Sequence, residues 1–175
     1  MEQHVLDTIA STKTSLYVAV YDITLESVGE ALVQAKQRGV DVRVIMDDEC
    51  AAKAGSQYSK LAQLSLVKTD HSSSNFMHNK FMVIDSQFVW TGSTNFTDRG
   101  VHYNNNNSIL INSGGLAQDY TAEFMEMWQD GEFGAKSPAN TPYPDVRVND
   151  AVVECYFAPE DGVEQEIIGE LSSAK

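Results

Sequence analysis

One stretch near the middle of the chain combines residue types that can attack a phosphate group and hold it. His78 and Lys80 are two residues apart, Asp85 follows them, and the run Gly92–Asn95 comes next. On an extended segment His78 and Lys80 would point to the same side, because side chains alternate along a strand. An imidazole can attack or carry a proton, and an ammonium group is a compact positive charge suited to a phosphate oxygen. The pair therefore predicts phosphate chemistry.

The residues after His78 predict a β-hairpin that brings the two halves of this motif together. Apolar residues dominate 81–84 and 88–90, and the residues between them fit a turn. The hairpin would return Gly92, Ser93 and Asn95 towards His78. Gly92 would let the backbone approach a ligand, and Ser93 and Asn95 would supply hydrogen-bonding groups. A buried hairpin with an incidental histidine and lysine is the alternative, but so many specified residue types at fixed spacing argue against coincidence.

The sequence around the motif predicts an α/β fold. A chain of 175 residues with 42% hydrophobic residues can bury a sizeable core. Between 16 and 46 the order strand, helix, Gly39, strand indicates a βαβ unit with a parallel crossover. We expect helices at 1–13, 26–38, 59–65, 116–128 and 163–175, and further strands at 16–20, 40–46, 66–68, 109–111 and 152–157.

The proline distribution predicts three parts: a lobe at 1–130, a proline-containing linker at 131–150, and the start of a second, truncated lobe at 151–175. Three of the four prolines fall in the linker. Residues 163–175 also align with residues 1–13, with matching Glu, Gln, Ser and Lys and with apolar residues in register. A chance likeness between two amphipathic helices is the alternative. The strand at 152–157 could then fill a vacant position in the sheet.

Charge and composition narrow the class of protein. The net charge of −13 argues against broad adhesion to a polyanion, although a small positive cleft remains compatible with it. Cys50 and Cys155 lie in separate segments and are expected to be free thiols. We find no signal-peptide pattern and no apolar run of membrane-spanning length in these residues, and we expect a soluble protein. A bacterial cytoplasmic location and secretion with a trimmed N-terminus both stay open.

Two other groups of polar residues could bind a metal or take part in catalysis. The acidic run at 47–49 follows a predicted strand and could hold a metal, but no further ligand is suitably spaced, so we expect a solvated loop. His71 is a second imidazole close to the motif, and we favour a loop histidine over a catalytic one.

The motif from His78 to Asn95 resembles the signature of the phospholipase D superfamily, and the order of elements over residues 1–130 is similar too. The resemblance implies a phospholipase D-like lobe: a mixed, largely parallel sheet flanked by helices in an α-β-α sandwich. It also implies a metal-independent phosphoric diester hydrolase that needs no cofactor. In that family one signature histidine forms a covalent phosphohistidine, and the histidine of a second lobe protonates the leaving oxygen. The second lobe belongs to the same chain or to a homodimer partner.

The resemblance also assigns roles to residues of the motif. His78 matches a signature histidine, although the resemblance does not say which of the two histidine roles it takes. Lys80 and Asn95 match phosphate-binding positions, with Ser93 lining the same pocket. Asp85 matches the third signature residue of the catalytic set, and we favour a structural or orienting role for it.

Asn106 departs from the family pattern. Family members commonly carry a glutamate there, which orients the histidine. An amide can accept a hydrogen bond but cannot stabilise an imidazolium as a carboxylate does. The resemblance nevertheless implies a phosphodiesterase acting on a phospholipid or a nucleic acid, and the compact lobe looks similar to the small bacterial endonucleases of the superfamily. The alternative is a catalytically silent lobe that binds phosphate or mediates dimerisation.

Overall fold

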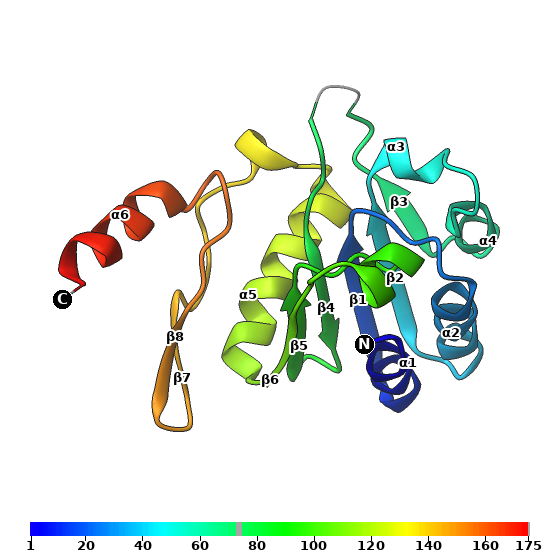
Figure 1. Cartoon of the computed structure of the whole chain (residues 1–175), viewed down its shortest axis with the longest axis horizontal. Coiled ribbons are helices and arrows are strands. Elements are labelled where there is room, and N and C mark those ends of the chain that lie inside the picture. The colour runs from blue at the N-terminus through cyan, green and yellow to red at the C-terminus, as the bar shows by residue number, and fades with distance from the viewer. Residues whose placement is uncertain (73–74, 175) are drawn as a thin grey trace.

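A six-stranded sheet forms the centre of the protein in the computed structural model, which describes residues 1–72 and 75–174 (Figure 1). Within these residues the strand order is β3-β2-β1-β4-β5-β6, so β1 and β4 lie in the middle. The strands are β1 (Ser15–Val20), β2 (Asp41–Met46), β3 (Val67–Thr69), β4 (Lys80–Ile84), β5 (Phe88–Gly92) and β6 (Ser108–Asn112).

The sheet changes direction at its centre. β1, β2 and β3 pair in parallel, which confirms the predicted βαβ unit. β4 runs antiparallel to β1, and β5 and β6 continue the antiparallel half. The β4–β5 pair is the predicted hairpin. The expected mixed sheet is therefore present, but parallel pairing accounts for only two of the five pairings in the described part of the chain.

Helices cover both faces of the sheet, as an α-β-α sandwich requires. Alternate residues of each strand face opposite layers: Val18 and Met82 join the core under the N-terminal helices, whereas Ala19 and Phe81 join the core under α5. No helix in the described residues has the length and apolarity needed to cross a membrane. The helices of the sandwich are α1 (Glu2–Ser11), α2 (Glu26–Gln37), α4 (Tyr58–Ala62) and α5 (Gly114–Met125).

A short helical turn occupies the acidic run at 47–49, which was expected to be a solvated loop. α3 (Asp48–Ala51) follows β2 directly, and Asp47 is fully buried at its N-terminus. The solvated loop predicted at 47–49 is therefore wrong, because the Asp47 side chain accepts a hydrogen bond from the Glu49 N–H and turns the chain into a helix. A π-helical turn (Arg99–Tyr103) lies within the polar loop after the motif, and another (Glu126–Asp130) extends α5.

The C-terminal segment forms a second, two-stranded sheet. β7 (Asp145–Val148) lies within the residues expected as linker, and it pairs antiparallel with β8 (Ala151–Glu154). The strand expected at 152–157 therefore does not enter the central sheet, because β7 takes its hydrogen bonds. This hairpin packs on the α5 side of the molecule through apolar side chains that include Val146, Val153 and Cys155. Cys50 and Cys155 are free thiols, as predicted, and the structure shows that both are buried.

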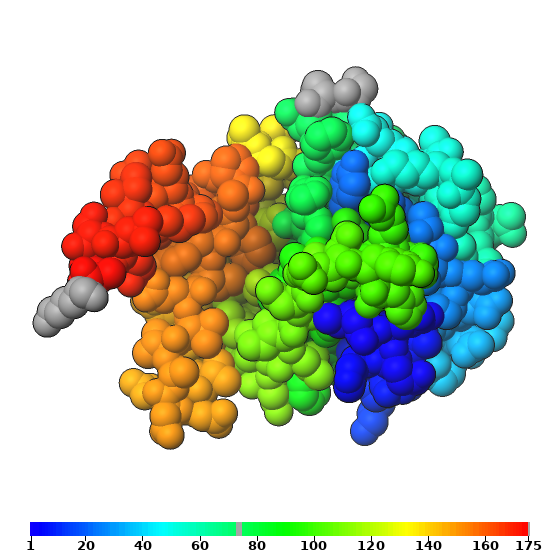
Figure 2. Space-filling model, viewed as in Figure 1, coloured from blue at the N-terminus to red at the C-terminus, as the bar shows by residue number. Residues whose placement is uncertain are grey.

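The last helix stands apart from both cores. α6 (Val163–Ser173) contains no buried side chain, and it lies at the edge of the molecule beyond the hairpin (Figure 2). α1, by contrast, buries Val5 and Ile9 completely against the central sheet and α2. The helix predicted at 163–175 is confirmed up to Ser173, and Lys175 lies outside the described residues.

Gly92 ends β5 with a backbone that only glycine adopts without strain. Its φ is +150°, and a Cβ atom placed there would come within 2.8 Å of the Ser108 Cα and would collide with the Asn107 carbonyl oxygen. We expect Gly92→Ala to lower the free energy of unfolding by about 3 kcal/mol or more, because overpacking and backbone strain add. Chemical denaturation measures this loss.

Gly39→Ala is the matched control for Gly92→Ala. Gly39 also has a positive φ, +93°, but no atom lies within 4 Å of its added Cβ. It should lose only about 1 kcal/mol, the cost of the left-handed conformation itself. Equal losses in the two variants would contradict the close approach of β5 and β6 at Gly92.

Candidate active site

His78 and Lys80 line one cavity of about 990 Å³ at the beginning of β4. The β4–β5 register pairs Phe81 with Thr91, and the Thr91 hydroxyl donates a hydrogen bond to the Lys80 carbonyl oxygen at 3.3 Å. Thr91 and Gly92 therefore lie on the wall of the same cavity. The hairpin brings Gly92 to the histidine end of the motif, as the sequence predicts.

The other walls come from segments far away in the sequence. α5 contributes Glu123, and the C-terminal extension (residues 131–174) contributes Tyr156 and Phe157. His71 also lines the cavity, and its Nδ1 lies 3.2 Å from the Thr69 hydroxyl. The sequence motif therefore forms one side of a space whose opposite side is built by α5 and by the residues after the β7–β8 hairpin.

Lys80 presents a largely buried ammonium group at the cavity. Its side chain donates a hydrogen bond from Nζ to the His78 carbonyl oxygen at 2.8 Å, and Nζ lies 5.5 Å from the centre of the Tyr21 ring. Burial lowers the pKa of Lys80 to about 8. The group stays mostly charged at neutral pH, and an anionic ligand would restore the stabilisation that burial removes.

His78 presents an accessible imidazole beside this cation. Its ring packs edge-on against Tyr21 at 5.1 Å between centroids. Burial lowers the pKa of His78, and the positive charge of Lys80 lowers it further, while the charge of Asp47 opposes the shift. The imidazole is therefore predominantly neutral at physiological pH, and a neutral imidazole is the form that can act as a nucleophile or a general base.

Tyr21 is a site residue that the motif did not reveal. It follows β1, and its backbone N–H donates to the Asn79 carbonyl oxygen at 3.1 Å. Its ring contacts His78 and also Phe76, which is 61% exposed. The sequence carries only a weak signal for this role, a tyrosine at the end of a buried strand.

The second half of the motif is only partly at the cavity. Ser93 and Asn95 follow Gly92 but do not belong to the cavity wall in the described residues. The Ser93 hydroxyl donates to the Asn106 side chain at 3.0 Å and accepts from the Asn107 N–H at 3.2 Å. Phosphate binding by Ser93 and Asn95 therefore stays a prediction.

Asn106 is held by the loop around it. Its amide nitrogen donates to the Gly100 carbonyl oxygen at 2.9 Å, and its amide oxygen accepts the Ser93 hydroxyl. Among the described residues no hydrogen bond joins Asn106 to His78. The amide thus fills a structural place between two loops, and its expected orienting contact with the histidine is not made here.

Asp85 lies at the opposite end of β4 from His78. Its carboxylate accepts hydrogen bonds from the backbone N–H groups of Lys13, Thr14 and Ser15, at 2.7 to 3.1 Å, and from the Thr14 hydroxyl at 2.9 Å. Asp85 is therefore not a member of the cavity, and its place among catalytic residues is corrected to a structural one. It ties the α1–β1 connection to the β4–β5 turn.

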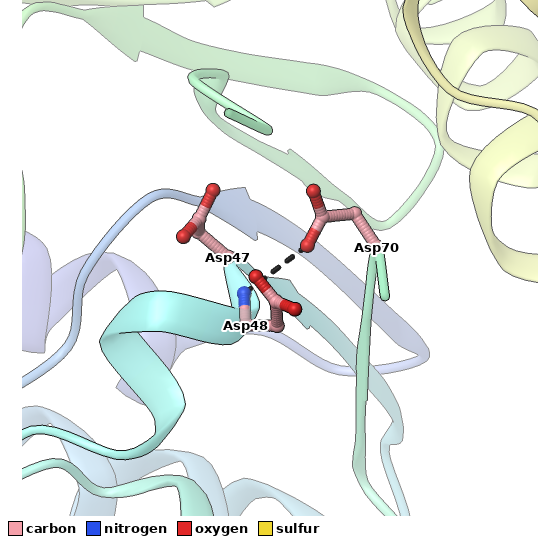
Figure 3. A group of neighbouring side chains, drawn as sticks. All are labelled: Asp47, Asp48 and Asp70. Atoms are coloured by element: carbon pink, nitrogen blue, oxygen red, sulfur yellow. Dashed lines mark hydrogen bonds between the residues drawn. The ribbon is translucent and has the colours of Figure 1, made fainter. Parts of the chain in front are cut away.

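Three aspartates gather near the beginning of the His78 segment (Figure 3). Asp47, Asp48 and Asp70 each bring a carboxylate oxygen within 4.8 Å of the others. Asp70 accepts a hydrogen bond from the Asp48 N–H at 3.1 Å, and Asp47 accepts two from other backbone groups. These bonds make the cluster part of the scaffold, and we assign no metal to it.

Glu123 places a carboxyl group on the far wall of the cavity. Burial, together with the charges of Glu160 and Glu126, raises the pKa of Glu123 to about 8. Asn79 donates to its Oε1 at 3.4 Å. The raised pKa favours the uncharged form of this carboxyl group.

The chain matches the family model described as "Cardiolipin synthase, PLD-like domain" over residues 5–128. It is 34% identical over 116 residues to a Xenopus tropicalis protein named mitochondrial cardiolipin hydrolase, covering 66% of this chain and 55% of that protein. The structure is similar to that of the phospholipase D family member Nuc from Salmonella typhimurium, with a TM-score of 0.67 and 31% identity. That match covers 73% of this chain and 86% of Nuc.

A third likeness concerns the fold alone. NucT from Helicobacter pylori gives a TM-score of 0.65 at 20% identity, covering 73% of this chain and 87% of NucT. The family-model match spans most of the chain, and its boundaries enclose the whole central sheet. The chain therefore belongs to the phospholipase D-like domain family. It spans about half the length of the curated relatives that it matches.

Asp85 should stabilise the fold without taking part in catalysis. We expect Asp85→Ala to lower the free energy of unfolding by about 2 kcal/mol at neutral pH, because several N–H groups lose a charged acceptor. Burial raises the pKa of Asp85, but the hydrogen bonds from Thr14, Ser15 and Lys13 outweigh it and hold the pKa below its usual value. The contribution is therefore complete above the unfolded-state pKa of about 4 and is lost as the pH falls below it.

Urea unfolding at pH 7 and at pH 3 measures this effect, with Asp98→Ala as the control. Asp98 is exposed and provides no side-chain cap to the turn that follows it. Its removal should change stability by less than about 0.5 kcal/mol at either pH. A loss for Asp85→Ala that matches the control, or that does not shrink at pH 3, would contradict the anchoring role.

Proposed function

We propose that this protein is a phospholipase D-type phosphodiesterase whose reaction runs through His78. The observation that carries the proposal is the pairing of a neutral, accessible imidazole with the buried ammonium group of Lys80 on one cavity wall. Lys80 supplies the positive charge for the non-bridging phosphate oxygens, with Asn95 and Ser93 as further donors once substrate is bound. Membership of the phospholipase D-like family supports the same reaction class.

The proposed reaction has two steps. In the first, the ring nitrogen of one signature histidine attacks phosphorus, the bond to the leaving oxygen breaks, and the second histidine gives that oxygen a proton. In the second, the second histidine takes a proton from water, the water oxygen attacks phosphorus, and the phosphorus–nitrogen bond breaks. The products are an alcohol and a phosphomonoester, and both histidines return to their starting state.

The second histidine comes from another lobe, in a further part of the chain or in a second copy of it. α6 supports this arrangement. The sequence alignment of 1–13 with 163–175 places Val5, Leu6 and Ile9 of α1 opposite the apolar face of α6. In α1 this face packs into the core. The matching residues of α6 are Ile167, Ile168 and Leu171, which are 54%, 48% and 71% exposed.

The reacting group of the substrate is a phosphodiester, as a phospholipid or a nucleic acid contains. The name of one relative points to cardiolipin, a phospholipid, whereas the Salmonella protein Nuc is named only as a phospholipase D family member. The net charge of −13 disfavours wide contact with either polyanionic surface. The shared phosphodiester chemistry is therefore the level at which the proposal is made.

Hydrolysis of bis(nitrophenyl) phosphate in excess chelator tests this proposal. We expect turnover that resists the chelator and that falls about 1,000-fold or more in His78→Asn, because the variant lacks the attacking nitrogen. His4→Asn is the matched control, since His4 is an exposed histidine on α1, and it should keep full activity.

Turnover that survives in His78→Asn, or that the chelator abolishes, would contradict the mechanism. His71→Asn separates two sources of the second histidine. Retained turnover in this variant agrees with a second lobe, whereas loss comparable to that of His78→Asn would place the second histidine in this chain, since His71 lines the same cavity.

A catalytically silent lobe that binds phosphate is the second candidate, and Asn106 favours it. Its side chain contacts Ser93 and Gly100, so no carboxylate stands at that position to support an imidazolium. Asn106→Glu should raise turnover about tenfold or more if the protein is a weakened enzyme, because the restored carboxylate stabilises the protonated histidine. Unchanged turnover in Asn106→Glu, together with phosphate binding that needs Lys80, would favour the silent lobe.

A further inference from the structure

Asp47 is a buried carboxylate that holds the backbone directly before His78. The residue is 0% exposed, and its two oxygens serve different partners. Oδ1 accepts from the Glu49 N–H at 3.0 Å, which begins α3. Oδ2 accepts from the Met77 N–H at 3.0 Å, one residue before the histidine. A buried carboxylate is costly unless it is satisfied in this way, so its position is strongly determined.

This contact crosses the sheet rather than following the chain. Asp47 directly follows β2, and Met77 leads into β4, while β1 lies between those two strands. On the other side of His78, the Asn79 carbonyl oxygen accepts the Tyr21 N–H at 3.1 Å. His78 is therefore held between two anchored neighbours. A shift of the Asp47 side chain would move the backbone that carries the imidazole.

Asp47 also acts on the imidazole through its charge. Its negative charge favours the protonated form of His78, against burial and the positive charge of Lys80. The structure thus has a carboxylate near His78 although Asn106 supplies none. The titratable and charged groups that face His78 or share its cavity are Asp47 after β2, Tyr21 after β1, Lys80 on β4, Asp70 and His71 after β3, Tyr120 and Glu123 on α5, and Lys136 and Tyr156 in the C-terminal extension.

We propose that Asp47 is the positioning residue of His78, fixing the backbone directly before it through the Met77 N–H and holding a buried negative charge close to the imidazole. This inference rests on the proposed function, because it assigns a supporting carboxylate to the same histidine. Asp47 would stabilise the positive charge that the His78 ring gains when its nitrogen bonds to phosphorus. It acts through His78 and through the Met77 backbone, and it has no contact with substrate in this scheme.

Asp47→Asn tests the inference, with Asp48→Asn as the matched control. Asp48 is the adjacent acid of the same cluster, but among the described residues its carboxylate makes no hydrogen bond to the backbone before His78. In nuclear magnetic resonance titrations of the histidine side chains, Asp47→Asn should lower the pKa of His78 and move the acidic limb of the pH–rate profile to lower pH. We also expect kcat to fall about tenfold to a hundredfold with little change in KM, the size of effect that a small misplacement of a reacting group produces. Asp48→Asn should change neither.

Asp47→Glu covers the case in which Asp47→Asn does not fold. It keeps the charge but lengthens the side chain, so it should preserve the His78 titration and still lose kcat. An unchanged His78 titration in Asp47→Asn, or full kcat in Asp47→Glu, would overturn the inference. The titration needs no turnover, so a wild-type protein without hydrolytic activity would count against the proposed function and leave the titration to decide this inference.

Discussion

The antiparallel pairing of β4 with β1 is the constraint on which the rest of the structure depends. β4 is buried along its whole length between β1 and β5, and its side chains alternate between the two cores. A slip by one residue would exchange the two faces and remove Lys80 from the cavity. The register therefore fixes two things at once: the active-site end of the strand at His78 and the structural end at Asp85. This explains why one signature contains residues with such different roles.

Burial sets the electrostatics of the site. Lys80 and His78 both lose solvation at the cavity, which favours the neutral form of each group. A cation that is partly desolvated before substrate arrives gains more from a bound phosphate than an exposed lysine would. The negative charge of Asp47 opposes this lowering of the pKa at His78 but not at Lys80. The balance leaves a neutral imidazole that is free to attack, which is the state that the first step of the proposed reaction needs.

The sequence predicts the local parts of this arrangement well and the long-range parts poorly. Periodicity and turn residues locate the βαβ unit, the β4–β5 hairpin and the approach of Gly92 to the histidine end, because these depend on neighbours in the chain. Tyr21 and Asp47 were missed as site residues because their contacts cross between strands that are distant in sequence. β7 was missed for another reason: the prolines directly before it, at 138, 142 and 144, are typical of a linker.

Direct detection of the covalent intermediate tests the central claim, that the beginning of β4 carries the reacting nitrogen. Protein can be quenched with alkali during turnover, digested, and its peptides measured by mass spectrometry, because phosphohistidine is stable in base. The account predicts a phosphoryl adduct on the peptide containing His78, absent from His78→Asn. Steady turnover with no adduct on any histidine, or with the adduct on a different residue of this chain, would contradict it.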